Sequence, residues 1–216
     1  MAFGALAYNE RLTRHRDTHL EEKYEGVKVL ATIVRPTAQD PFQSLVVKWT
    51  YRNISALSRM RDRVFIEANG IMIDSNGNEV AYHLIHSIDS IPRIPGFKHL
   101  DIMRANLSTC YISRQFDQSS VEVFCRGFVD PGGNLAESIT ISAFTDFMLS
   151  VVHVVDCAYT KKLTLLVHRK QQSAATNSDS QSPASHCSHC AASLTTFGNL
   201  IHTGTACRAC RQEICN

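Results

Sequence analysis

The stretch Ile141-Ser-Ala-Phe-Thr-Asp-Phe-Met-Leu-Ser-Val-Val-His-Val-Val-Asp-Cys-Ala158 decides the fold. Its apolar residues recur at intervals of three and four, which lays them along one face of a helix: Ile141, Phe144, Met148, Val151, Val155 and Ala158. The spacing predicts one helix over about residues 142–166, roughly 37 Å long at 1.5 Å per residue. A single helix of that length needs a broad apolar surface to rest on, so the residues before it must supply a sheet.

The residues before this helix alternate with the period of two that is typical of β-strands. Residues 27–34 and 45–51 are followed by two stretches around a turn at 74–78, and by two more around a turn at 117–120. These stretches predict about six antiparallel strands. We therefore expect an α+β fold: an antiparallel sheet wrapped on a long C-terminal helix, followed by a small cysteine-rich segment.

Composition and charge limit the classes of protein that fit. The 216 residues are 44% hydrophobic and 19% charged with a net charge of +2, which is a globular profile without the broad positive field that favours nucleic acid. The first residues lack a basic signal-peptide region, and the longest apolar stretch, 147–155, is interrupted by Ser150 and His153. We therefore expect neither a secretory signal nor a membrane span, and a reducing, cytoplasmic compartment.

The eight cysteines are distributed unevenly and mark the domain boundaries. Five of them crowd into the last 30 residues, after a serine-rich stretch at 171–185 that reads as a linker. The sequence therefore predicts a polar N-terminal segment at 1–26, forming a weak surface helix or a frayed terminus, a body at 27–170, this linker, and a finger at 186–216.

Two CxxC pairs make the finger a metal-binding candidate. In Cys187-Ser-His-Cys190 and Cys207-Arg-Ala-Cys210 the two-residue spacing lets both thiolates face one ion. The segment has too few large apolar residues for a core of its own, so metal binding must supply its folding energy. Together with Cys215, these four cysteines are the predicted zinc ligands. A redox CxxC would need a surrounding βαβ unit, which this sequence pattern does not contain.

The spacing of the five cysteines resembles the first five ligands of the FYVE finger, a cross-braced fold with eight ligands around two zinc ions. The resemblance implies that Cys187, Cys190 and Cys215 share one ion, while Cys207 and Cys210 belong to the second. The sequence ends at Asn216, before the positions of the remaining ligands.

Two interpretations of this finger stay open. It is a truncated FYVE-like finger, or it folds around a single ion held by both CxxC pairs, with Cys215 and three histidines spare: His186, His189 and His202. A RING-like fragment is a weaker alternative, because the CxH element of that family is missing. The family's cationic phosphoinositide-binding cluster is also missing, since residues 201–206 contain neither Arg nor Lys.

The body, over about residues 27–166, resembles a START domain, and more narrowly the START-like modules that precede FYVE-type fingers. The order of several short stretches carries this resemblance: Ala31-Thr-Ile, Asp40-Pro-Phe-Gln-Ser-Leu-Val-Val-Lys-Trp49, Arg61-Asp-Arg-Val-Phe-Ile-Glu67, Ala81-Tyr-His-Leu-Ile-His-Ser87, Ser113-Arg-Gln115 and Val121-Glu-Val-Phe-Cys-Arg-Gly-Phe-Val-Asp-Pro131. It implies a helix-grip fold whose sheet and helix enclose an apolar tunnel, and a lipid ligand without covalent chemistry. The N-terminal helix and two strands that START domains have before this point are largely missing from the match.

The candidate lipid-binding residues lie on the expected strands and helix: Trp49, Tyr82, Leu84, Arg114, Arg126, Phe147, Met148 and Val151. Most of the apolar ones would be core residues in any α+β domain, and the two arginines can equally face solvent. No catalytic motif of the HExxH, GxSxG or phosphate-loop kind is present in the sequence.

We therefore expect a non-enzymatic lipid-binding or lipid-transfer module. In this interpretation, a zinc finger recruits it to a protein partner or, peripherally, to endosomal membranes. The alternative is a protein-interaction adaptor whose helix-grip domain has no lipid cavity.

Overall fold

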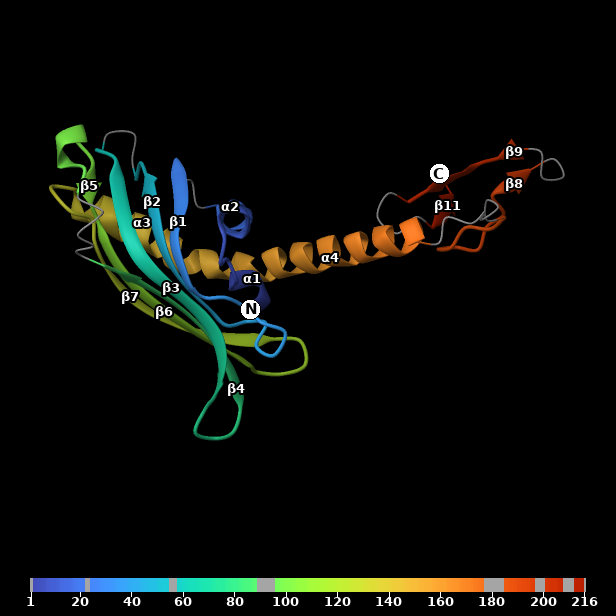
Figure 1. The fold of residues 1–216 in the computed structure, drawn as a ribbon, viewed down its shortest axis with the longest axis horizontal. Coiled ribbons are helices and arrows are strands. Elements are labelled where there is room, and N and C mark those ends of the chain that lie inside the picture. Colours follow the sequence, from blue (N-terminus) through green and yellow to red (C-terminus); the bar gives the residue numbers. More distant parts are fainter. Residues whose placement is uncertain are drawn as a thin grey trace. The chain divides into compact units, whose positions relative to one another are not determined.

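The computed structural model describes residues 2–21, 24–54, 58–88, 96–176, 185–196, 201–207 and 212–215 (Figure 1). The chain divides into two compact units, Met1–Tyr159 and Thr160–Asn216. The first contains the sheet, and the second begins inside the last helix and includes the cysteine-rich tail. Each unit is described separately below.

The first unit is built on a seven-stranded sheet with the strand order β1-β2-β3-β4-β6-β7, in which all these neighbours are antiparallel. The strands are β1 (Gly26–Val34), β2 (Ser44–Arg52), β3 (Arg61–Ile73), β4 (Glu79–Ser87), β5 (Met103–Arg104), β6 (Asn106–Gln115) and β7 (Val121–Asp130). The predicted strands and the α+β class are confirmed. The short β5, which pairs with β3 in parallel, has no counterpart in the prediction, because two residues carry no readable period.

The expected long helix is present but contains a tighter segment. It consists of α3 (Glu137–Leu149), the 3₁₀ segment η2 (Ser150–His153) and α4 (Val154–Thr176). At the junction, the Ser150 hydroxyl donates a hydrogen bond of 2.7 Å to the Phe147 carbonyl oxygen. Such back-bonding by serine competes with the regular helical ladder. The prediction of one continuous helix is therefore correct for the position of the helical stretch but misses η2.

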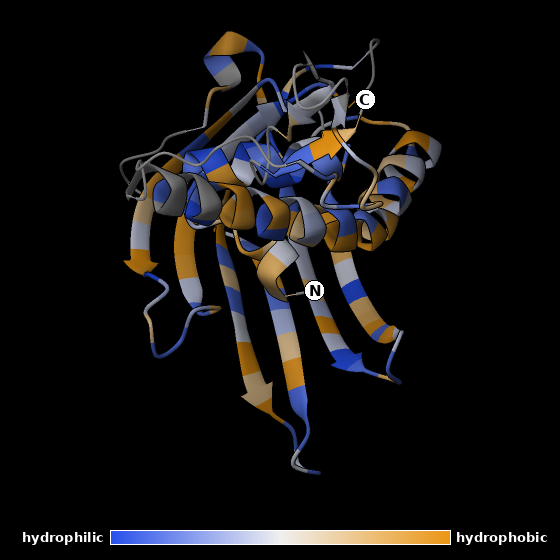
Figure 2. Ribbon diagram, turned by 90° about the vertical axis from the view of Figure 1, so that its right-hand side faces the viewer, coloured by the Kyte–Doolittle hydropathy of each residue, from blue (hydrophilic) through white to orange (hydrophobic). Residues whose placement is uncertain are grey.

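The helix packs on one face of the sheet through a small apolar core. Phe147 of α3 joins Phe65, Ile85 and Leu107, from β3, β4 and β6, and each of the four is at most 7% exposed. Val129, Phe144 and Met148 pack against this cluster. Figure 2 shows the alternation of apolar and polar residues along the strands that lets one face meet the helix. We call this the helix-facing face of the sheet.

The N-terminal residues form a surface helix, which is one of the two predicted alternatives, but they also contribute buried residues that the prediction did not foresee. They form α1 (Ala2–Ala5) and α2 (Glu10–His19), and Ala5 and Leu20 join a second buried cluster with Val154 of α4. The Asn9 side chain accepts a hydrogen bond of 2.9 Å from the Leu12 amide and caps α2. The buried residues of α2 are Thr13, Arg16 and Asp17, so its inner face is polar. The spacing of apolar residues therefore could not reveal that α2 packs on the sheet.

Among its described residues, the second unit has four short strands besides the remainder of α4. They pair as two antiparallel two-stranded sheets, β8 (Thr195–Thr196) with β9 (Ile201–His202), and β10 (Gly204–Ala206) with β11 (Glu213–Cys215). Sheets this small are not stable on their own. The expectation that the tail needs another source of folding energy is therefore consistent with its secondary structure.

One helical stretch, Glu137–Arg169, is long and apolar enough to cross a membrane by length and composition alone. This differs from the prediction that the chain has no such segment. Only 11% of its most apolar window is buried. Core helices of globular proteins also meet this test, and Phe147 and Val154 belong to the buried clusters of the first unit.

Gly4 allows α1 to approach the last helix closely. A β-carbon at this position would overlap the Val154 carbonyl oxygen, which belongs to backbone and cannot rotate away. We predict that Gly4→Ala lowers the free energy of unfolding by about 1–3 kcal/mol, as overpacking typically does. Urea titration followed by circular dichroism measures the change. Gly96→Ala is the matched control, because a β-carbon there meets no atom within 4 Å; equal stability of the two variants would contradict the packing.

Candidate functional site

Five of the eight predicted lipid-binding residues lie on the face of the sheet that is turned away from α3. Arg126 pairs with Cys110, Cys110 with Leu84, and Leu84 with Ala68, so these side chains share one face, opposite to the core residues of the same strands. The same alternation places five predicted residues on the face turned away from α3: Trp49, Tyr82, Leu84, Arg114 and Arg126. They therefore do not line the space between the sheet and the helix, and a role of these five residues in lipid binding stays a prediction.

Local interactions of these residues fit their outward position. The Trp49 indole nitrogen donates to Asp62 at 2.9 Å, and Asp62 also accepts two hydrogen bonds from Arg104. Arg114 forms an exposed ion pair with Glu122 at 2.6 Å. A shift of one residue in strand phase moves every side chain to the other face, so alternation alone does not decide which residues face the helix.

The three predicted helix residues do face the sheet. Phe147 is part of the core cluster, and the Tyr111 hydroxyl donates to the Met148 sulfur at 3.4 Å. Val151 packs against the cluster that contains Ala5. Any role of these residues in lipid binding stays a prediction.

A buried cluster of charges occupies the helix-facing face. The Glu67 carboxylate accepts hydrogen bonds from Lys48 at 2.8 Å and from Arg16 of α2 at 2.6 Å, while Arg16 also pairs with Asp17 at 3.2 Å. Lys48 and Glu67 are fully buried, and Arg16 and Asp17 are each 4% exposed. His83 completes the group, with its Nε2 3.6 Å from Glu67 and its ring stacked on Tyr111. We call these five residues, Arg16, Asp17, Lys48, Glu67 and His83, the charged cluster.

The charges of the cluster depend on one another. Burial by itself opposes ionisation of Glu67, but Arg16 and Lys48 outweigh it and hold the pKa of this carboxyl well below its ordinary value. Burial lowers the pKa of Lys48, and Glu67 opposes that lowering. Burial also lowers the pKa of His83 against the pull of Glu67, so the imidazole is neutral at pH 7. Glu67 is the residue on which both cations depend.

Sequence reasoning missed this cluster. Lys48 lies within the quoted run 40–49 and Glu67 at the end of 61–67, both in strands that alternate correctly. Neither residue was among the predicted site residues. The strand register pairs Val46 with Glu67 and so brings Lys48 next to Glu67. Together with Arg16 from a distant helix, this contact makes the burial of Lys48 and Glu67 favourable.

Further polar atoms on this face have no partner among the described residues. Thr50 Oγ1, Asn69 Oδ1 and Thr109 Oγ1 are buried without a hydrogen bond within the described part of the chain. Their strand positions share the face of Lys48, Phe65 and Leu107. Buried polar groups favour a hydrogen-bonding partner such as water or the polar part of a ligand.

A cleft of about 590 Å³ opens beside this face, between the end of α2, the end of β2 and the helical stretch α3–η2. Its walls include Leu20, Ile54, Phe147 and Val152, and its polar lining includes Arg52, Asp146 and His153. We call it the α3 cleft. Its volume lies within the range of about 300–1,000 Å³ that small-molecule sites occupy. A second cavity of about 480 Å³ near Arg59, Arg61 and Met103 is more polar.

The second unit brings three of the predicted zinc ligands together. The sulfur atoms of Cys187, Cys190 and Cys215 all lie within 4.8 Å of one another, and those of Cys190 and Cys215 are 3.6 Å apart. We call these residues the three-cysteine cluster. Cys207 lies outside it, and Cys210 lies outside the described residues. The grouping is the one that the FYVE resemblance assigns to a single ion.

The backbone explains how two distant segments meet at this cluster. The Ala191 amide donates to the Cys187 carbonyl oxygen at 2.9 Å and closes a tight turn, and Ala191 has a positive φ of 58°. The Ser188 amide and hydroxyl both donate to the Glu213 carbonyl oxygen, at 3.0 and 2.9 Å. This pair of bonds fastens the turn to β11, which carries Cys215.

The donor set fits a zinc ion. The amides of Cys190, Cys215 and His189 lower the pKa of the Cys187 thiol to about 6, whereas the neighbouring Cys190 and Cys187 sulfurs raise the pKa of Cys215 to about 11. Thiolates crowded in this way gain from a shared cation. Tetrahedral zinc with Zn–S bonds of about 2.3 Å separates its sulfur ligands by roughly 3.8 Å, close to the Cys190–Cys215 spacing. Zinc here would hold the turn and β11 together; it would be structural.

Comparison with known proteins gives only distant likenesses. No protein-family model matches the chain, and no curated protein matches it. Among solved structures, human STARD10 has a TM-score of 0.47 at 14% identity over 73% of this chain. The human StarD13 (DLC2) lipid transfer and protein localization domain has a TM-score of 0.45 at 13% identity over 67% of this chain. Human StAR-related lipid transfer protein 5 has 0.43 at 13% identity over 66%.

These matches cover only part of the solved chains: 57% of STARD10, 66% of StarD13 and 64% of StAR-related lipid transfer protein 5. The sheet and the helix on it define the α+β helix-grip class by themselves. The function therefore has to be argued from the cleft and the three-cysteine cluster.

The charged cluster predicts a large and specific loss of stability. In Glu67→Gln, Lys48 and Arg16 lose their shared buried carboxylate, and breaking such a pair costs about 3–5 kcal/mol of unfolding free energy. Glu122→Gln is the matched control, because its ion pair with Arg114 is exposed and worth less than about 1 kcal/mol. Denaturant unfolding of both variants measures the difference. Similar losses would show that the cluster does not hold the fold.

The same substitution has a defined pH dependence. A carboxyl whose pKa is depressed in the folded state stabilises that state above its unfolded pKa of about 4.3, and the stabilisation is lost as pH falls through the folded value. The stability gap between wild type and Glu67→Gln should therefore be greatest near pH 7 and shrink in acid. Unfolding midpoints measured between neutral and acidic pH test this, and a gap that widened in acid would contradict it.

Proposed function

We propose that the protein is a non-enzymatic lipid-binding or lipid-transfer module with a zinc-binding tail. The α3 cleft carries this proposal. Its volume suits an acyl chain or a small amphiphile, its apolar wall includes Leu20, Phe147 and Val152, and Arg52 lies where an anionic group can be bound. The resemblance of the body sequence to START domains supports a binding role rather than a catalytic one.

The occupied helix-facing face limits the kind of ligand. Helices α1 and α2 contact this side of the sheet, and the charged cluster fills its middle. A ligand as large as a whole phospholipid would have to displace them, at the cost of exposing paired charges. We therefore propose that the ligand is a single chain or a small amphiphile held in the α3 cleft.

A protein-interaction adaptor without a lipid site is the second candidate. The observation that favours it is the same occupation of the sheet by α1 and α2, which leaves no tunnel along the strands in the described part of the chain. In this alternative, the α3 cleft is a surface depression that leads to no cavity and holds no lipid. The two candidates differ in whether the purified protein retains a lipid.

We further propose a cytoplasmic protein in peripheral contact with a membrane, endosomal by the FYVE resemblance of the tail. An outward apolar row on α3, η2 and the start of α4 supports contact with an apolar surface: Ile141, Leu149, Val152, Val155 and Tyr159 are 39–67% exposed. Single exposed apolar residues are common, whereas a row of five along one helical stretch is not.

Native mass spectrometry of the purified full chain tests the lipid proposal. We expect a co-purifying lipid, and we expect Val152→Glu to remove it, because a carboxylate in the cleft wall opposes an acyl chain. Val155→Glu is the matched control: it is also exposed and lies on the same helical stretch, outside the cleft lining. If the purified chain carries no lipid, or if Val152→Glu retains as much lipid as the wild type, the result would favour the protein-interaction adaptor.

The zinc proposal is tested by metal content. Inductively coupled plasma mass spectrometry of the full chain should find zinc, and Cys187→Ser should lose one equivalent because two cysteines alone hold an ion weakly. Cys125→Ser, an exposed cysteine of β7 outside the cluster, should keep the wild-type content. Unchanged zinc in Cys187→Ser would remove the three-cysteine cluster from consideration.

A further inference from the structure

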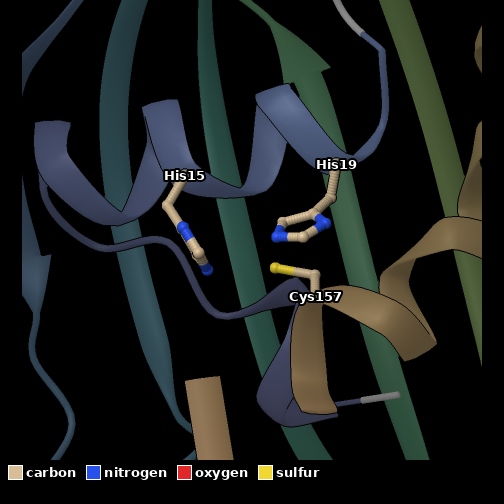
Figure 3. Close-up of side chains that lie close together, drawn as sticks. All are labelled: His15, His19 and Cys157. Atoms are coloured by element: carbon tan, nitrogen blue, oxygen red, sulfur yellow. The ribbon is translucent and has the colours of Figure 1, made fainter. Parts of the chain in front are cut away.

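Three metal-ligating side chains from two helices meet in the first unit, far from the tail in sequence. His15 and His19 of α2 and Cys157 of α4 have ligand atoms that all lie within 4.8 Å of one another. Figure 3 shows both imidazole rings projecting from the same side of α2 toward the sulfur of Cys157. The two ring centroids are 4.9 Å apart and the ring planes are inclined by 78°.

Helical geometry and burial set up this cluster. Residues four apart lie on one face of a helix, so His15 and His19 must project together. Cys157 is fully buried, and its thiol donates to the Gly4 carbonyl oxygen at 3.6 Å. The two histidines are half-buried, so an ion can reach them from solvent while the sulfur is held in place by the fold.

We infer that His15, His19 and Cys157 form a second metal site, which binds a borderline transition-metal ion of the zinc class. A spacing of three residues between two histidines is one that zinc-binding helices use. Ligand atoms around tetrahedral zinc lie roughly 3.3–3.8 Å apart, so rotation of the two half-buried imidazoles is enough to close this group around an ion. Two nitrogens and one sulfur exclude Mg²⁺ and Ca²⁺, which require oxygen ligands.

Binding of the ion releases one proton to solvent. The Cys157 thiol gives up its proton to solvent and binds as thiolate, and both imidazoles bind through a neutral nitrogen. Three protein ligands leave the fourth tetrahedral position to water or to an external ligand. This arrangement differs from a closed structural site, in which four protein ligands surround the ion.

The site links parts of the chain that are distant in sequence. Cys157 lies 153 residues after Gly4, and α2 lies almost as far from α4. An ion here crosslinks the N-terminal helices to the last helix, and it therefore stabilises the contact that buries Ala5 and Leu20. The inference rests on the first unit alone and is independent of the proposed lipid and of the tail.

The test removes the tail ligands first. In the full chain, the five tail cysteines are replaced by serine: Cys187, Cys190, Cys207, Cys210 and Cys215. After dialysis against Co²⁺ or Zn²⁺, we expect one metal equivalent, and with Co²⁺ the visible absorption of a tetrahedral site with a sulfur ligand. His15→Ala and His19→Ala, introduced separately, should each weaken binding by more than about tenfold, since even outer partners of a metal ligand contribute that much.

His168→Ala and Cys125→Ser are the matched controls, because both residues are exposed and lie outside the cluster. They should retain the full equivalent. The two cluster histidines are preferred to Cys157 as test positions, because a buried cysteine substitution disturbs packing against Gly4. As a second readout, zinc should raise the thermal midpoint of the parent but not of His15→Ala or His19→Ala.

Two results would overturn the site. The first is a tail-substituted chain that binds no metal while remaining folded by circular dichroism. The second is a chain in which both histidine variants bind as much metal as the controls. Neither result bears on the α3 cleft, and loss of zinc from the tail alone leaves this site untouched.

Discussion

The hydrogen bonds that Glu67 accepts from Lys48 and Arg16 are the interaction on which the rest of the first unit depends. They bring strand β2, strand β3 and helix α2 to one point inside the sheet's helix-facing side. Charges buried this deeply are tolerated only when their partners are fixed. Arg16 can pair with Glu67 only when α2 lies on the sheet. That position also brings Ala5 and Leu20 into apolar contact with Val154.

This constraint also shapes what the protein can bind. A helix-grip fold whose sheet is apolar could hold a long chain between strands and helix. In this protein the same space holds paired charges and two short helices, so the available room is displaced to the α3 cleft, where α2, β2 and η2 meet. The buried cluster therefore supports the proposal that a ligand of this protein is small enough for the α3 cleft.

Much of the architecture could be predicted from the sequence, because strands and helices each impose a characteristic spacing on the apolar residues. The alternation at 27–34 and 45–51 and the three-four spacing after Ile141 each describe one element without reference to another. The three-cysteine cluster was foreseeable for a similar reason, since the Cys187–Cys190 spacing is itself a ligand geometry. The FYVE resemblance added Cys215 to that pair.

The missed features depend on pairs that are remote in sequence. Lys48 is a charged residue between apolar neighbours in its strand, and its burial is explained only by Glu67, which accepts hydrogen bonds from both Lys48 and Arg16. The polar inner face of α2 hid its packing on the sheet for the same reason. His15 and His19 have a readable spacing, but Cys157 lies 138 positions beyond His19 and nothing local connects them.

The contact between Gly4 and the last helix has a consequence for how the chain folds. Residues separated by about 150 positions must meet before Gly4 of α1 reaches its contacts with Val154 and Cys157, so local structure alone cannot form this contact. Contacts of such long sequence separation slow folding. We therefore expect the docking of α1 on α4 to come late in the folding of the first unit.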